Sequence, residues 1–131
     1  MMDEKNIKME ISHGYQGEVY WDQNQIQQVM MNLIQNSIDA IKSDGEIRIA
    51  TEYVNDEIII SVSDNGEGIA EDKLNKIFNL YYTTKAKGTG IGLSLVQKII
   101  YEHGGLVNLE SEKNAGTKIM IKLPKRYKDI Q

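Results

Sequence analysis

The chain has 131 residues, a formal net charge of −4 and no cysteine. This length suits one domain, residues 1–131, and the missing cysteines exclude a disulfide framework, a thiolate nucleophile and a zinc–cysteine cluster. A net negative charge argues against binding to nucleic acid or to an anionic membrane. No apolar run approaches the roughly 18 residues of a membrane span, and the polar start lacks the apolar segment of a signal peptide. We expect a cytoplasmic domain without direct membrane contact, in a parent protein that could extend upstream and carry an anchor.

Periodicity predicts the elements of the first third of the chain. Two short strands, at about 7–12 and 18–21, are followed by Asp22, which occupies the N-cap position of a helix over about 25–42. The apolar and small residues that recur at three- and four-residue steps on this helix predict one buried face, formed by Ile26, Val29, Met30, Leu33, Ser37 and Ile41.

The rest of the chain mixes helices and strands without strict alternation. The predicted elements are a strand at 46–53, a strand at 57–63, a short helix at 71–77, a helix at 92–103, and two strands at 106–111 and 117–123 that form a hairpin. This order predicts an α/β two-layer sandwich, with a mixed sheet packed against helices on one face.

Three polar residues form a stripe on the predicted helix at 25–42. Asn32, Asn36 and Asp39 are spaced i, i+4, i+7, so they lie along one side of the helix, at the border of its apolar face. Short oxygen-bearing side chains in this arrangement could coordinate a hard cation or bind a phosphate. The same pattern could also be only the polar edge of a helix.

A carboxylate and two glycines follow the buried strand at 57–63. Asp64 begins the stretch Asp64-Asn65-Gly66-Glu67-Gly68, in which the glycines would let a ligand approach the backbone closely. The carboxylate could accept a hydrogen bond from the exocyclic amine of a base. A plain Asp-Asn-Gly turn explains the stretch equally well.

A second glycine-rich stretch, residues 88–93, runs into the predicted helix at 92–103. Backbone N–H groups at a helix N-terminus, together with the helix dipole, favour phosphate. The stretch is not the dinucleotide fingerprint, because leucines stand at the third-glycine positions, and the chain has no P-loop. Thr83, Thr84 and Lys85 precede it and could meet a terminal phosphate, although they could also form a solvated turn.

Four segments in this order resemble the nucleotide-binding boxes of sensor histidine kinases, which belong to the GHKL superfamily with gyrase B, MutL and a class of heat-shock chaperones. The segments are QVMMNLIQNSIDAI, DNGEGI, IFNLYYTTKAKGTGIGLSL and AGTKIMIKLP, and the resemblance covers roughly residues 20–123. It implies the Bergerat fold, in which a mixed, mostly antiparallel sheet of about five strands packs on three helices. It also implies ATP and Mg²⁺ as ligands.

The resemblance implies roles for individual positions. Asn36 matches the magnesium-binding asparagine, Asn32 the residue one turn earlier near the phosphates, and Asp64 the aspartate that reads the adenine amino group. Lys85 is the candidate contact to the γ-phosphate, and Asn32 and Lys85 are therefore the candidate catalytic residues. The remaining candidate nucleotide-binding residues are Asp39, Gly66, Gly68, Ile69, Phe78, Thr83, Thr84, Gly88, Thr89, Gly90, Ile91, Gly92, Leu93 and Thr117.

Asn32 separates the subclasses of the superfamily. In the ATP-hydrolysing relatives a glutamate at this position activates water, whereas an asparagine cannot act as a general base. This favours a kinase. The resemblance also implies a flexible lid over ATP. The sequence departs from the family pattern at Ser37, where alanine is common, and at Leu80-Tyr81-Tyr82, where proline and two aromatic residues are common, so the resemblance does not define how the lid behaves.

The chain lacks an acceptor histidine in a suitable context. His13 lies in a predicted turn and His103 ends a predicted helix, so both are interpreted as structural. We therefore expect a domain that transfers the γ-phosphoryl group of Mg-ATP to a histidine on a separate helical hairpin, with a response regulator as the indirect partner. The alternatives are a serine-directed kinase of the anti-sigma-factor type, an ATP-gated interaction module without catalysis, and an ATPase.

Overall fold

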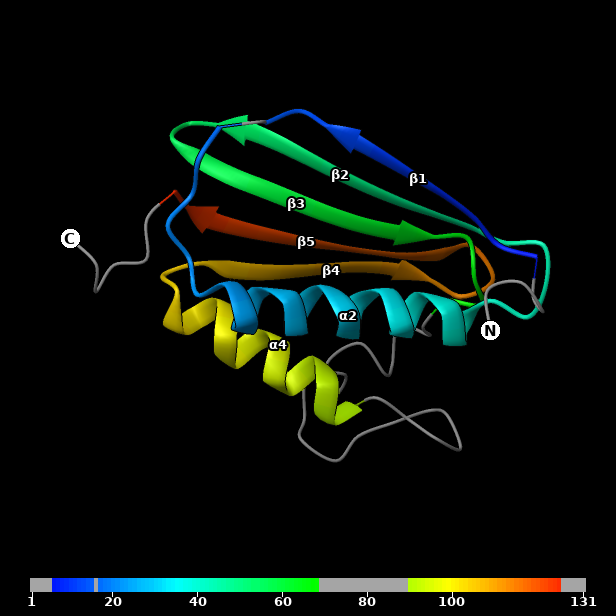
Figure 1. Ribbon diagram of the computed structural model, residues 1–131. Coiled ribbons are helices and arrows are strands. Elements are labelled where there is room, and N and C mark those ends of the chain that lie inside the picture. The colour runs from blue at the N-terminus through cyan, green and yellow to red at the C-terminus, as the bar shows by residue number, and fades with distance from the viewer. Residues whose placement is uncertain (1–5, 16, 69–89, 126–131) are drawn as a thin grey trace.

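The computed structural model describes residues 6–15, 17–68 and 90–125, which form a five-stranded sheet with two helices on one of its faces (Figure 1). The elements are β1 (Lys8–His13), α2 (Gln23–Ala40), β2 (Glu46–Val54), β3 (Glu57–Asp64), α4 (Gly90–Glu102), β4 (Leu106–Glu112) and β5 (Gly116–Pro124).

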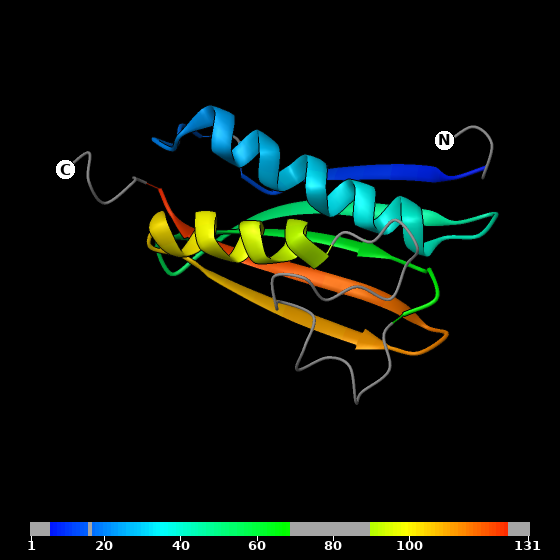
Figure 2. The same ribbon diagram turned by 90° about the horizontal axis from the view of Figure 1, so that it is seen from below.

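The strand order across the sheet is β1-β2-β3-β5-β4. β1 is parallel to β2, and the other neighbours are antiparallel. Both described helices lie on the same face of the sheet (Figures 1 and 2). The predicted α/β two-layer sandwich with a mixed, mostly antiparallel sheet is therefore confirmed, and the predicted helix at 71–77 lies outside the described residues. Neither described helix is long and apolar enough to cross a membrane.

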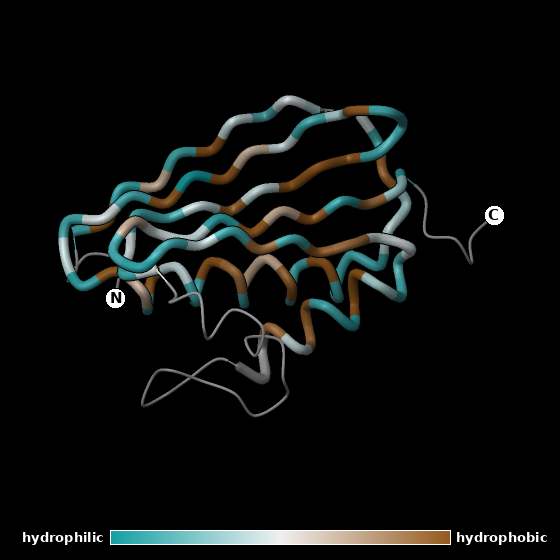
Figure 3. Tube along the Cα trace, turned by 180° about the vertical axis from the view of Figure 1, so that it is seen from behind, coloured by the Kyte–Doolittle hydropathy of each residue, from teal (hydrophilic) through white to brown (hydrophobic). Residues whose placement is uncertain are grey.

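Alternation along the strands places the core between the sheet and the helices. Ile58, Ile60 and Val62 of β3 are buried and face the helices, whereas Ile59 between them is only half-buried. Ile119, Ile121 and Leu123 continue the same layer on β5. Apolar and polar segments accordingly alternate along the strands in Figure 3.

The helix α2 begins where its N-cap signal predicts. The carboxylate oxygen Oδ1 of Asp22 accepts a hydrogen bond from the Gln25 backbone N–H at 3.1 Å, which satisfies one of the donors that a helix start leaves unpaired. The helix starts and ends about two residues earlier than predicted. Its predicted buried face is confirmed, with Ile26 and Met30 partly buried and the other members buried.

The predicted strand at 18–21 is wrong, because only one residue of this segment pairs. The Tyr20 N–H donates to the Lys125 carbonyl at 2.7 Å, next to the point where β5 ends at Pro124. Val19 and Trp21 nevertheless point toward the core, so the alternation that suggested a strand is real. The indole N–H of Trp21 donates to the Pro124 carbonyl at 2.6 Å, so a side chain makes the next contact with β5.

His103 is fully buried and joins α4 to the start of α2. Its Nε2 accepts from the Asp22 backbone N–H at 3.2 Å, and its Nδ1 lies 2.9 Å from the Ile99 carbonyl. Both contacts are satisfied together only by a neutral ring that carries its proton on Nδ1. The structural role of His103 is confirmed.

Replacing His103 by alanine is expected to lower the free energy of unfolding by about 2–5 kcal/mol, because it creates a cavity and removes the acceptor of the Asp22 N–H. Urea denaturation followed by circular dichroism measures the change. The exposed His13 is the matched control, and its replacement by alanine should change the free energy by less than about 0.5 kcal/mol. Equal losses at the two histidines would contradict the structural role of His103.

Candidate functional site

Three parts of the chain meet at one end of the sheet. The C-terminal end of α2, the C-terminal end of β3 and the turn between β4 and β5 lie together there (Figure 1). The helix α4 runs antiparallel to α2, so its N-terminus points toward this same end (Figures 1 and 2). The positive end of the α4 dipole is therefore directed toward the end of the sheet that holds the polar candidate site residues Asn36, Asp39, Asp64 and Thr117.

Asp64 and Thr117 sit side by side at this end of the sheet. Asp64 is the last residue of β3, and its register partner on β5 is Thr117. Because Val62 and Ile119 face the helices two residues away, Asp64 and Thr117 face the helix side as well. Both are half-buried. The carboxylate oxygen Oδ1 of Asp64 accepts the Gly66 backbone N–H at 2.8 Å, which fixes the orientation of the carboxylate.

Ser111 extends this pair to a third strand. It is the register partner of Thr117 on β4, and its Oγ lies 2.8 Å from the Thr117 Oγ1. The Ser111 hydroxyl also donates to the Gly116 carbonyl at 2.9 Å. Sequence analysis missed Ser111, since only the cross-strand register shows that it lies beside Thr117. A shallow hollow of about 360 Å³ at this edge of the sheet is lined by Asp64, Ser111 and Thr117 and by Ser63, Glu110, Glu112, Ala115, Gly116 and Lys118.

The glycines of the turn at residues 64–68 stand where the backbone has no room for a side chain. A Cβ on Gly66 would lie 2.6 Å from the Ala40 carbonyl oxygen. Gly68 has a φ of +71°, and a Cβ there would collide with the Glu112 carbonyl. Gly66 and Gly68 are therefore required by packing and backbone conformation as well as by any ligand.

Backbone hydrogen bonds hold this turn between α2 and the β4–β5 hairpin. The Glu67 N–H donates to the Ala40 carbonyl at 2.9 Å, and the Asn114 N–H donates to the Glu67 carbonyl at 2.6 Å. The side chain of Asn65, which sequence analysis did not select, accepts the Glu46 N–H at 2.8 Å and ties the turn to β2. The turn is thus hydrogen-bonded to α2, β2 and the β4–β5 hairpin, although Asn65 and Glu67 themselves are exposed.

The polar stripe on α2 is partly buried. Asn36 is 9% exposed and lies one turn before Ala40, and Asn32 is half-buried one turn further from the site. Asp39 is also half-buried, and its Oδ1 accepts a hydrogen bond from the Gln35 amide at 2.9 Å. The interpretation as a plain polar edge therefore suits Asp39 better than Asn36, because a buried asparagine needs a polar environment.

The remaining candidates divide into two groups. Gly90, Ile91 and Gly92 form the first residues of α4, and the buried side chain of Leu93 belongs to the core, so Leu93 could contact a phosphate only through its backbone N–H. The other candidates lie outside the described residues: Ile69, Phe78, Thr83, Thr84, Lys85, Gly88 and Thr89.

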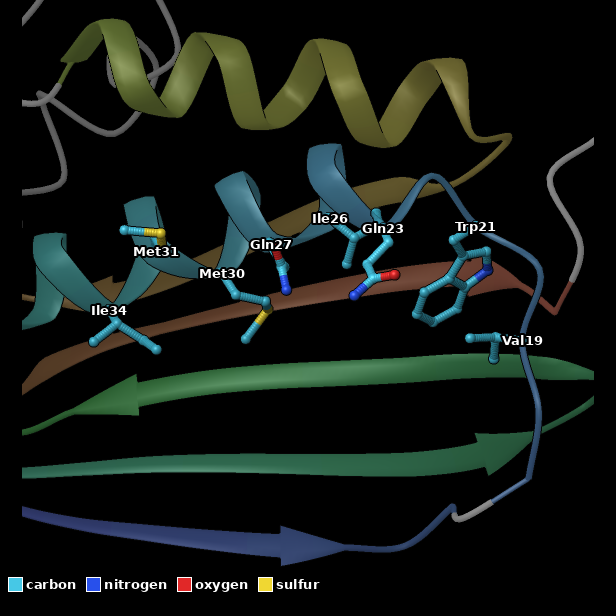
Figure 4. Close-up of a pocket in the computed structure, with 8 residues that line it drawn as sticks. All are labelled: Val19, Trp21, Gln23, Ile26, Gln27, Met30, Met31 and Ile34. Atoms are coloured by element: carbon cyan, nitrogen blue, oxygen red, sulfur yellow. The ribbon is translucent and has the colours of Figure 1, made fainter.

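A larger groove of about 710 Å³ lies elsewhere, along the side of α2 near its N-terminus (Figure 4). Its lining side chains carry no charge: Val19, Trp21, Gln23, Ile26, Gln27, Met30, Met31 and Ile34. A polyphosphate needs cations, N–H donors or a metal ion, so this groove does not suit a nucleotide despite its size.

Residues 21–127 match the family of histidine kinase-, DNA gyrase B- and HSP90-like ATPases. The chain belongs to this family. Sensor histidine kinase ZraS of Salmonella typhimurium is 46% identical over 104 residues, which are 79% of this chain and 22% of that protein. Sporulation kinase E of Bacillus subtilis is 40% identical over 109 residues, which are 82% of this chain and 15% of that protein. The chain therefore spans only about a fifth of the length of such relatives.

Solved structures of this ATPase family share the fold. The catalytic domain of histidine kinase ThkA has a TM-score of 0.86 and 36% identity, covering 97% of this chain and 84% of that chain. Histidine kinase ThkA in complex with the response regulator protein TrrA has a TM-score of 0.78 and 32% identity, covering 95% of this chain and 36% of that chain. The resemblance found in the sequence is thus confirmed at the level of the family and of the fold.

Replacing Gly116 by alanine is expected to lower the free energy of unfolding by about 3 kcal/mol, since its φ of +112° strains an L-residue and a Cβ would collide with the Asp64 carbonyl. Gly104 is the matched control. It also has a positive φ, +81°, but a Cβ there would meet only Pro124 Cγ at 3.7 Å, so its replacement should cost about 1 kcal/mol. Chemical denaturation of both variants measures the difference, and equal losses would contradict the close packing at Gly116.

Proposed function

We propose that this domain binds Mg-ATP and transfers the γ-phosphoryl group to a histidine on a separate helical hairpin of the parent protein, in cytoplasmic two-component signalling. The observation that carries the proposal is the fixed Asp64 carboxylate beside Thr117, at the end of the sheet toward which the α4 N-terminus points. The identity to sensor histidine kinase ZraS supports the kinase class.

Adenine would bind at Asp64. A carboxylate accepts hydrogen bonds only, so it suits the exocyclic amine of adenine and repels the carbonyl oxygen that guanine carries at the same position. The Gly66 N–H holds one carboxylate oxygen in place, which lowers the entropy lost when the base binds. The neighbouring glycines let the turn pack against α2 and the β4–β5 hairpin, which fixes the place of Asp64.

The phosphates would lie between α2 and α4. The N-terminus of α4 offers backbone N–H groups and the positive end of its dipole to an anion. The Asn36 amide oxygen would supply one ligand to Mg²⁺, which neutralises charge on the phosphates when bound.

The residue types favour phosphoryl transfer over hydrolysis. Asn32 lies one turn before Asn36 on α2 and carries an amide, which cannot take a proton from water. Phosphoryl transfer to a histidine requires positioning and charge neutralisation more than a base supplied by this domain. The ThkA structure with a response regulator supports a response regulator as the partner of the parent protein. A serine-directed kinase remains the alternative, and its product would be acid-stable.

Replacing Asp64 by asparagine is expected to weaken binding of Mg-ATP by about 30-fold or more. With the new amide oxygen held by the Gly66 N–H, the amide NH₂ group would face the adenine amine, so two donors would meet and a charge-assisted hydrogen bond would be lost. Isothermal titration calorimetry measures the affinity. Asp56→Asn, at an exposed turn, is the control and should bind as the unchanged chain does. Equal affinity in both variants would remove Asp64 from the site.

A further inference from the structure

The contacts of Ser111 with the Gly116 carbonyl and with the Thr117 hydroxyl fit together in one arrangement of protons. Ser111 has a single hydroxyl proton, and it donates that proton to the Gly116 carbonyl at 2.9 Å, since a carbonyl can only accept. The 2.8 Å contact between the two hydroxyl oxygens must then be made by the Thr117 proton, which donates to Ser111 Oγ. The direction of hydrogen bonding therefore runs from Thr117 through Ser111 to the backbone of residue 116.

This direction of hydrogen bonding determines whether the Thr117 hydroxyl can donate to a ligand or only accept from it. A threonine hydroxyl normally rotates and can either donate or accept. Here its proton is committed to Ser111, so only lone pairs remain for a group that approaches from the Asp64 side. Thr117 is the register partner of Asp64, which means that two acceptors stand side by side at the end of the sheet.

The chain of hydroxyls is anchored in rigid structure. Its final acceptor, the carbonyl of Gly116, belongs to a buried glycine with a φ of +112° that packs against the Asp64 backbone. Ser111 and Thr117 are paired across the β4–β5 hairpin, and both side chains are partly buried. The carbonyl cannot reorient without breaking the packing of residue 116, so the orientation of both hydroxyls is set by the fold.

We propose that Ser111 is a specificity-positioning residue that holds the Thr117 hydroxyl as a hydrogen-bond acceptor and thereby selects purine bases with an amine, and not a carbonyl, at C6. The inference rests on the proposed adenine site and deepens it. Ser111 does not need to touch the nucleotide. Its effect is to prevent Thr117 from turning its proton toward a carbonyl oxygen at C6, so that such a base meets two acceptors and no donor.

Adenosine and inosine diphosphates provide the test, because they differ at C6 and at the adjacent ring nitrogen, N1, while the ribose and phosphates are the same. Calorimetry on the 131-residue chain gives the ratio of the two dissociation constants, inosine to adenosine. In Ser111→Ala the Thr117 hydroxyl is released and can donate to the inosine carbonyl, so the ratio should fall by about five- to tenfold, the size of one neutral hydrogen bond. Ser111→Thr keeps a hydroxyl at the same place in a strand and should restore the ratio.

A second variant separates positioning from general damage. Thr117→Val removes the hydroxyl that Ser111 orients, so adding Ser111→Ala to Thr117→Val should leave the ratio unchanged. Should Ser111→Ala not fold, as judged by thermal melting, Ser111→Cys carries the same prediction in smaller measure, because a thiol is a weak donor. An unchanged ratio in Ser111→Ala, or an equal loss for both nucleotides, would overturn the proposal. If the unmodified chain bound neither nucleotide, the proposed function itself would fail.

Discussion

Close backbone contact around the turn at residues 64–68 is the constraint on which the rest of the site depends. The turn touches the end of α2 through Ala40 and the β4–β5 hairpin through Glu112 and Asn114. These contacts are possible only because glycine stands at positions 66, 68 and 116. Asp64 is thus placed by three elements at once, and a displacement of α2 relative to the hairpin would move its carboxylate.

The candidate site has hydrogen-bond acceptors on the sheet and hydrogen-bond donors at a helix N-terminus. Acceptors gather where β3 ends and β5 begins, at Asp64 and Thr117, whereas the N-terminus of α4 points N–H groups and a positive dipole toward the same end of the sheet. A ligand with a donor at one end and several negative charges at the other satisfies both sides, and a nucleoside polyphosphate has this character. The net charge of −4 makes this local arrangement necessary, since the chain as a whole repels anions.

Much of the fold was predictable because its signals are local. The strands at 46–54, 57–64, 106–112 and 116–124 lie within about a residue of their predicted bounds, and Asp22 caps α2 as its position indicates. The strand at 18–21 failed because strand formation depends on a partner, and within this segment only Tyr20 bonds to a neighbouring backbone, at Lys125. The alternation of apolar and polar residues does not show whether a neighbouring strand is available for pairing.

The site was predictable to the extent that motif residues mark it. Asp64, Thr117 and the turn glycines were selected, and the structure brings them together. Ser111 and Asn65 were not selected, since their importance comes from the register of β4 with β5 and of the turn with β2, which are contacts between segments far apart in the chain. Leu93 was selected as part of a glycine-rich stretch, but its side chain fills the core.

The central claim is that this domain supplies a phosphoryl group to a histidine carried elsewhere. The most direct measurement mixes the chain with the proposed histidine-bearing helical hairpin of the parent protein, adds γ-labelled Mg-ATP and follows the protein-bound label through acid treatment. We expect label on the hairpin that acid removes, because phosphohistidine is acid-labile. Acid-stable label would contradict it in favour of a serine-directed kinase, and nucleotide binding without any label would indicate an ATP-gated interaction module.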